Sequence, residues 1–89
     1  MKIYALASKP TVKKDIKYLP KGIISRCKTT ILSLAENPLP LGVVKLKDYK
    51  NTYRIRVGNY RIIYEINNKK RVLTVLKIGH RKDIYRKFN

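Results

Sequence analysis

The sequence is poor in cysteine, in acidic residues and in long apolar runs, and each scarcity excludes a class of protein. The single cysteine, Cys27, excludes an internal disulfide framework and any metal site built from several cysteines. No apolar run approaches the roughly 20 residues that a membrane-spanning helix needs. The chain also shows no cleavable hydrophobic leader, so we expect a cytoplasmic location and no contact with a membrane.

Acidic residues number only 5 against 22 Lys or Arg, which gives a net charge of +17 with the single histidine neutral. Confining so many like charges in a small volume costs stability through self-repulsion. We therefore expect a polyanion or an acidic protein as the partner. Hydrophobic residues make up 44% of the 89 residues and are spread along the whole length, so we expect one folded domain over 1–89 and not a disordered basic tail.

The first half of the chain predicts a strand and two helices. Residues 1–6 are short and rich in β-branched and aromatic side chains, as in a strand. Ser8 is a candidate N-cap for an amphipathic helix. This helix has Pro10 near its start and ends before Pro20. A second apolar stripe, over 24–34, predicts another helix that packs against the first as a hairpin.

The second half changes from a helical period to a period of two. Residues 39–50 are interrupted by proline and predict a loop, with room for a short edge strand. Three strands follow at 53–57, 60–66 and 72–78, and a final short helix is expected over 81–88. We therefore predict an α+β fold in the order β-α-α-β-β-β, with a small antiparallel-rich sheet and the helix hairpin packed on one face.

Gly58 and Asn59 form a two-residue hairpin signal that fixes which side chains share a face. With this turn, the tyrosines and aliphatic residues of both strands lie together and predict the core side. The opposite face carries Arg54, Arg56 and Arg61, with Arg56 directly across from Arg61. Like charges in such a pair destabilise a sheet, so an anionic ligand should compensate.

The third strand extends this basic face if Ile66 pairs with Val72. The inward set would then be Val72, Thr74, Leu76 and Ile78. Lys77 would lie beside Arg61, and Arg56, Arg61 and Lys77 would form a row of cations suited to a phosphate. A shift of two residues would keep the face and move the row. The other interpretation is that these are ordinary solvated residues of a very basic protein.

Two groups near the end of the third strand add proton-transfer chemistry. His80 is the only side chain that titrates near neutral pH without help, and Tyr85 supplies a hydroxyl. Attack of a ribose 2′-oxygen on the adjacent phosphate needs one proton removed, charge stabilised and one proton given to the leaving oxygen. Arginine supplies only the charge stabilisation. Alternatively, His80 is a surface residue that ends a strand and Tyr85 packs the last helix.

Two segments resemble the RelE branch of the RelE/ParE toxin superfamily. They are residues 53–64 (YRIRVGNYRIIY) and 75–86 (VLKIGHRKDIYR), and the helix hairpin and the connector at 46–53 are similar too. The resemblance implies the toxin of a type II toxin–antitoxin system. Its expected activity is that of a ribosome-dependent endoribonuclease, which cleaves mRNA in the ribosomal A site without a metal or cofactor.

Carried over onto this sequence, the resemblance implies catalytic roles for Arg54, Arg56, Arg61, Arg81 and Tyr85. We add His80 as a general acid or base, and expect Lys77 and Lys47 to bind substrate. The arginines at 54 and 56 stand where lysines are common in the family, which weakens any mechanism with a lysine base. Tyr85 also follows Arg81 more closely than in the best-known member.

The resemblance further implies a cognate acidic antitoxin that wraps the toxin, with operator DNA bound only by their complex. Two alternatives remain open. A ParE-like protein would poison DNA gyrase without nuclease activity, and a non-catalytic RNA-binding module would bind RNA with a steep salt dependence and not cleave it. The second alternative is less favoured because the strand tyrosines are expected on the core side and not as exposed stacking platforms.

Overall fold

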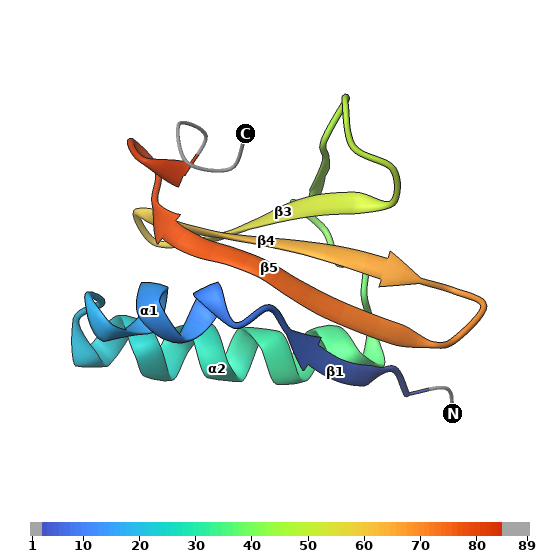
Figure 1. Ribbon diagram of the computed structural model, residues 1–89, viewed down its shortest axis with the longest axis horizontal. Coiled ribbons are helices and arrows are strands. Elements are labelled where there is room, and N and C mark those ends of the chain that lie inside the picture. Colours follow the sequence, from blue (N-terminus) through green and yellow to red (C-terminus); the bar gives the residue numbers. More distant parts are fainter. Residues whose placement is uncertain (1–2, 85–89) are drawn as a thin grey trace.

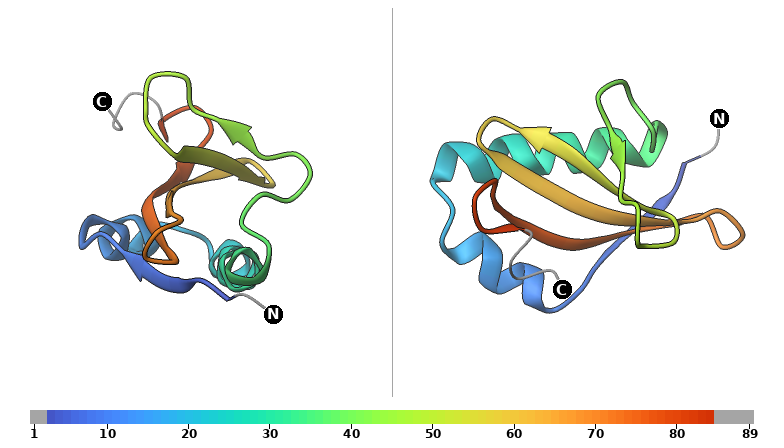
Figure 2. Two further views of the ribbon diagram at one scale, coloured as in Figure 1. Left: turned by 90° about the vertical axis from the view of Figure 1, so that its right-hand side faces the viewer. Right: turned by 90° about the horizontal axis from the view of Figure 1, so that it is seen from above.

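The computed structural model describes residues 3–84, which form two helices and a five-stranded mixed sheet (Figure 1). The sheet order is β1-β5-β4-β3-β2. Both helices lie on one side of the sheet, as the two further views also show (Figure 2). The predicted α+β class is confirmed. The elements are β1 (Ala5–Ser8), α1 (Thr11–Lys17), α2 (Lys21–Glu36), β2 (Val44–Lys45), β3 (Thr52–Val57), β4 (Tyr60–Asn67) and β5 (Val72–His80).

The first strand extends further along the chain than the sequence indicated. Ser8 belongs to β1 and pairs with Val75 of the parallel strand β5, and the next amide, Lys9 N–H, donates to Val75 O at 3.0 Å. The backbone here is therefore held by the sheet, and α1 begins only at Thr11, after Pro10 and without a side-chain cap. The prediction that Ser8 caps the helix is wrong for this reason.

The remaining boundaries follow the sequence more closely. The first helix, α1, ends at Lys17, before Pro20, and α2 begins directly after this proline at Lys21. The short edge strand β2 lies within 39–50, where the sequence left room for one. Of the predicted final helix over 81–88, the structure describes only 81–84, and 81–83 form a turn.

The main core lies between the sheet and the helices. Leu34 of α2, Ile62 and Tyr64 of β4 and Leu73 of β5 are completely buried there. Ile63 is also completely buried, but it lies outside this cluster because it alternates with Ile62 and faces the other side of the sheet. The face opposite the helices therefore includes a buried apolar position as well as its arginines.

An extra residue in β5 changes the register that the sequence suggested. Ile66 pairs with Leu73 and not with Val72, and an irregularity between Ile63 and Tyr64 leaves Leu76 without a direct partner. Such a bulge reverses the alternation of the strand. The shift of one residue at Leu73 makes the predicted inward set wrong at Val72 and Thr74, and the unpaired Leu76 then restores the predicted sides of Lys77 and Ile78. Val72, Thr74 and Leu76 are accordingly only half-buried, while Leu73, Val75 and Ile78 are buried.

Tyr64 connects the core to the loop that follows α2. Its hydroxyl donates to the carbonyl of Pro38 at 2.6 Å. Burial, together with the neighbouring Tyr53, raises the pKa of Tyr64 above its ordinary value of 10.0. The unfolded chain therefore loses this proton at a lower pH than the native protein does, so native stability decreases as pH rises above 10.0.

We expect Tyr64→Phe to flatten this alkaline decrease, because it removes the group that ionises only on unfolding. The slope that one such group adds is at most about 1.4 kcal/mol per pH unit. Urea unfolding on both sides of pH 10.0 measures it. Tyr18→Phe is the control, because Tyr18 is 85% exposed and its hydroxyl meets water in both states. A Tyr64→Phe slope as steep as that of the wild type would contradict the assignment.

Candidate active site

Arg56 of β3 and Arg61 of β4 face each other across the hairpin, in the register that the Gly58-Asn59 turn predicted. Arg54 lies on the same face, opposite Ile63. The two facing guanidinium groups are held by the turn itself: Arg56 Nε donates to Gly58 O at 3.3 Å, and Arg61 Nη1 donates to Gly58 O at 3.2 Å. The turn therefore gathers positive charge at one end of the sheet.

Arg61 lies among several other positive charges at this end of the sheet. Partial burial lowers the pKa of Arg61, and the charges of Arg56, Arg54 and Arg81 lower this pKa further. An arginine remains protonated at neutral pH despite such shifts. Burial is the largest cause of the lowered pKa, and the remainder comes from the neighbouring positive charges, which a bound anion would offset.

Arg26 is a member of this cluster that sequence reasoning missed. Gly58 has a positive φ of +60°, and the place that a Cβ would take lies 3.2 Å from Arg26 Nη1. Arg26 belongs to α2, so it reaches the turn from the helix side of the sheet, while Arg56 and Arg61 approach from the other. Nothing in the sequence signals this, because Arg26 stands among ordinary polar residues of an exposed helix face.

Lys77 does not join the row that the sequence proposed. It pairs with Ile63, and Gly79 is the residue beside Arg61, so the guessed register was wrong. Lys77 Nζ instead forms an ion pair with Asp15 Oδ1 at 3.3 Å, and the other oxygen of Asp15 accepts from the backbone N–H of Ile78 at 3.1 Å. The charge of Lys77 is therefore partly neutralised where it stands.

His80 ends β5, opposite Tyr60, and alternation places it on the other side of the strand from the Arg61 and Gly79 pair. The two rings meet edge to face, with 5.3 Å between centroids. The backbone N–H of Lys82 donates to His80 Nδ1 at 3.2 Å. A neutral ring in this position therefore carries its proton on Nε2.

The other predicted site residues lie apart from one another or outside residues 3–84. Arg81 is exposed directly after β5, and its backbone N–H donates to Asn59 O at 2.9 Å, so it lies beside the same turn. Lys47 is exposed in the loop after β2. Tyr85 lies outside the described residues.

Cys27 is buried, and burial raises the pKa of its thiol, while the charge of Arg26 opposes this change.

Within residues 3–84, no three His, Cys, Asp or Glu side chains are grouped to hold a metal ion. No helix in the same range is long and apolar enough to cross a membrane.

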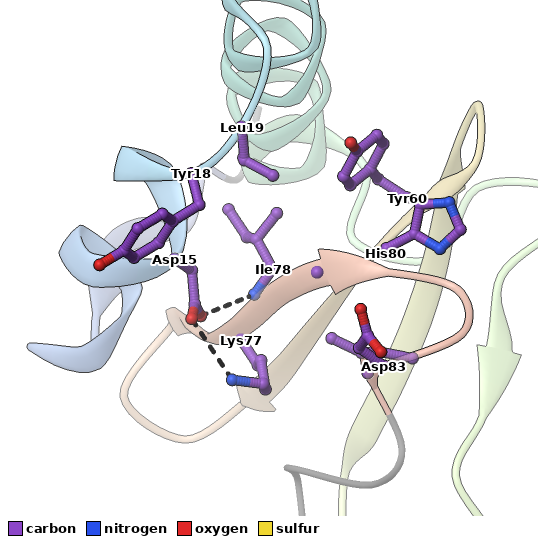
Figure 3. A pocket seen from close by; sticks show the side chains of 10 residues that line it. Asp15, Tyr18, Leu19, Tyr60, Lys77, Ile78, His80 and Asp83 are labelled. Carbon is purple, nitrogen blue, oxygen red and sulfur yellow. Dashed lines mark hydrogen bonds and ion pairs between the residues drawn. The ribbon is translucent and has the colours of Figure 1, made fainter.

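A pocket of about 350 Å³ opens beside this end of the sheet (Figure 3). Asp15 of α1 and Tyr18, directly after this helix, line one side, Tyr60 and His80 line the other, and Asp83 comes from the turn after β5. The pocket exists because β1 pairs with β5 only as far as Val75, after which a helix and not a strand lies along β5. Arginines and a histidine pocket thus share one end of the fold.

Comparison with known proteins places the chain in a family. The family model for the ParE toxin of the type II toxin–antitoxin system parDE matches residues 7–85. The chain belongs to this toxin family. Its curated relatives include Toxin RelE3 of Methanocaldococcus jannaschii, 43% identical over 79 residues that cover 84% of the chain and 88% of the relative. Toxin RelG of Mycobacterium tuberculosis is 28% identical over 85 residues, 94% of the chain and 98% of the relative.

Solved structures also show that the toxin is similar to RelE proteins. The archaeal RelE–RelB complex of Pyrococcus horikoshii superposes with a TM-score of 0.79 at 32% identity, covering 91% of the toxin and 97% of the matched chain. The RelB–RelE complex of Methanococcus jannaschii gives a TM-score of 0.76 at 37% identity, covering 93% and 99%. The toxin therefore shares both fold and sequence with RelE proteins.

We expect Gly58→Ala to destabilise the toxin by about 1–2 kcal/mol, because an L-residue is disfavoured at positive φ. The new methyl group would also displace Arg26. Gly22→Ala is the matched control: it lies in α2 with open space around it, and it should be neutral or stabilising by about 0.5–1 kcal/mol. Urea unfolding measures both, and equal effects of the two substitutions would contradict the role of the turn.

Proposed function

We propose that this toxin is a ribosome-dependent endoribonuclease that cleaves mRNA in the A site. The observation that carries the proposal is the facing pair of Arg56 and Arg61, joined at the same turn by the charge of Arg81. Within the described residues, neither Arg56 nor Arg61 forms an ion pair with a carboxylate. Planar donors crowded in this way suit a phosphate, whose oxygens accept two parallel hydrogen bonds from one guanidinium.

The proposed reaction is attack of a ribose 2′-oxygen on the adjacent phosphorus. The new bond joins the 2′-oxygen to phosphorus, the bond from phosphorus to the 5′-oxygen breaks, and a cyclic phosphate end results. The proton of the 2′-hydroxyl leaves as the bond forms, and the departing 5′-oxygen receives a proton. Arg56 and Arg61 stabilise the charge that grows on the phosphate oxygens, and Arg54 and Arg81 add to the field.

The two proton transfers are assigned to His80 and Tyr85. In the neutral ring, His80 Nδ1 is occupied by the Lys82 amide, so Nε2 presents an N–H and not a lone pair. A neutral ring of this tautomer has no free lone pair to act as the base, and His80 would give a proton to the 5′-oxygen only as the imidazolium. Because His80 lies on the other side of β5 from Arg61, a substrate would have to meet both groups around the edge of this strand. The role of Tyr85 rests on the family resemblance alone.

Arg61→Ala should lower the rate of mRNA cleavage by about 10²- to 10³-fold, as loss of one preorganised donor typically does. The assay adds purified toxin to translating ribosomes and maps the mRNA ends. Lys69→Ala is the control. Lys69 is exposed in the loop at the far end of β4, and its substitution removes the same charge as Arg61→Ala does. An Arg61→Ala protein as active as the control would contradict the proposed site.

The same assay separates the alternatives. Intact mRNA together with trapped gyrase–DNA cleavage complexes would indicate the ParE-type activity, which the description of the matching family model favours as the second candidate. Salt-sensitive RNA binding without either activity would indicate a non-catalytic RNA-binding module.

We also propose an acidic antitoxin as the partner, with operator DNA bound only by the toxin–antitoxin complex. The net charge of +17 supports such a partner, and the similar archaeal structures are RelE–RelB complexes. A small acidic open reading frame beside the toxin gene is the expected companion. Its product should co-purify with the toxin and suppress the cleavage.

A further inference from the structure

The pocket at the end of β5 differs in charge from the rest of this basic protein. The chain has five acidic residues, and two of them, Asp15 and Asp83, line this one pocket. Both oxygens of Asp15 are engaged, by Lys77 and by the Ile78 amide. The carboxylate of Asp83 forms no hydrogen bond or ion pair within residues 3–84, so it presents free acceptors to the pocket.

The walls of the pocket suit a flat aromatic ligand. Tyr60 and His80 stand edge to face with 5.3 Å between ring centroids, and Tyr18 lies across from them (Figure 3). The volume of about 350 Å³ is within the range of small-ligand sites. Aromatic side chains in such positions stack on or pack against unpaired bases of RNA.

The chemistry of Asp83 excludes the simpler occupants. Lys77 offsets the charge of Asp15, so the uncompensated carboxylate of the pocket is that of Asp83, which repels a phosphate. The described residues group no three His, Cys, Asp or Glu side chains that could hold a metal ion. A carboxylate accepts hydrogen bonds from the exocyclic amino group of a base, as in contacts of Asp or Glu with cytosine. Uracil has no exocyclic amino group and offers a carboxylate only its single N3–H, so it gains least from this acceptor.

The pocket reaches the arginine face around the edge of β5, where β1 no longer pairs with it. Lys77 and Gly79 line the pocket and belong to that face, because they pair with Ile63 and Arg61. Arg81 follows His80 directly. A nucleotide whose phosphate is held at Arg61 therefore has a base, its own or that of its neighbour, close to the pocket.

We propose that this pocket binds one mRNA base beside the scissile phosphate and that Asp83 accepts a hydrogen bond from its exocyclic amino group. The pocket thereby selects cytosine, adenine or guanine over uracil at one position. This inference rests on the proposed nuclease function, because it assigns a base subsite to the same RNA substrate.

The test measures cleavage on ribosomes programmed with mRNAs that differ by one base in the A-site codon. At one codon position, we expect the wild type to cleave the uracil message with a kcat/KM about tenfold lower than the cytosine message. Asp83→Ala should bring this ratio to within about twofold, and Asp83→Asn, which keeps one acceptor, should lie between. Glu36→Ala, at the exposed end of α2, should keep the wild-type ratio. An unchanged ratio in Asp83→Ala would overturn the proposal.

A second measurement keeps the pocket testable without cleavage. His80 is the only histidine, so its imidazole protons give one isolated set of NMR signals next to the pocket. Cytidine and uridine monophosphates carry equal charge, and we expect cytidine monophosphate to shift these signals at a concentration about tenfold lower. Asp83→Ala should remove the difference, and its spectrum also reports whether the variant is folded.

The two measurements distinguish the two possible failures. A selective shift of the His80 signals in a protein that leaves mRNA intact would overturn the nuclease function and keep the pocket as a base site. Cleavage of mRNA together with equal shifts for the two nucleotides would overturn the pocket and keep the nuclease.

Discussion

The turn at Gly58 and Asn59 brings two arginines face to face, and most of the candidate active site depends on that contact. Arg56 and Arg61 repel each other as direct cross-strand partners, which costs stability in an unliganded sheet. The carbonyl of Gly58 offsets part of the cost, because it accepts from both guanidinium groups. A positive φ at Gly58 lets the chain reverse tightly enough for this arrangement. The site is thus held in a state that favours an anion before any anion arrives.

The helix layer and the sheet both contribute positive charge at this turn. Arg26 approaches it from α2, so positive charge surrounds Gly58 from the helix side as well as from the open face. Asp15 has the opposite effect a short distance away: it binds Lys77 and replaces a missing strand by accepting from the Ile78 amide. The end of β5 therefore separates into a cationic part beside Arg61 and an acidic, aromatic part beside His80. This separation is what a nucleotide, with its anionic phosphate and neutral base, would require.

Much of this arrangement was predictable because it depends on local rules. Strand alternation and the two-residue turn fix the β3 and β4 register, so Arg54, Arg56 and Arg61 had to share a face. The second hairpin was less predictable, since its connection is longer and no turn signal fixes its register. A shift of one residue at Leu73 and the unpaired Leu76 together moved Lys77 from Arg61 to Ile63. A bulge of this kind depends on packing on both faces and leaves no local signal.

The amino-acid sequence alone determined the element order, the turn and the basic face, because each follows from side-chain period and from the conformations that glycine allows. Tertiary structure decided which cations remain available and which are neutralised. Asp15 and Lys77, like Arg26 and Gly58, are distant in sequence and meet only when α1 and α2 pack on the sheet. Contacts between distant segments depend on how whole elements pack against each other, and no short stretch of sequence encodes that packing.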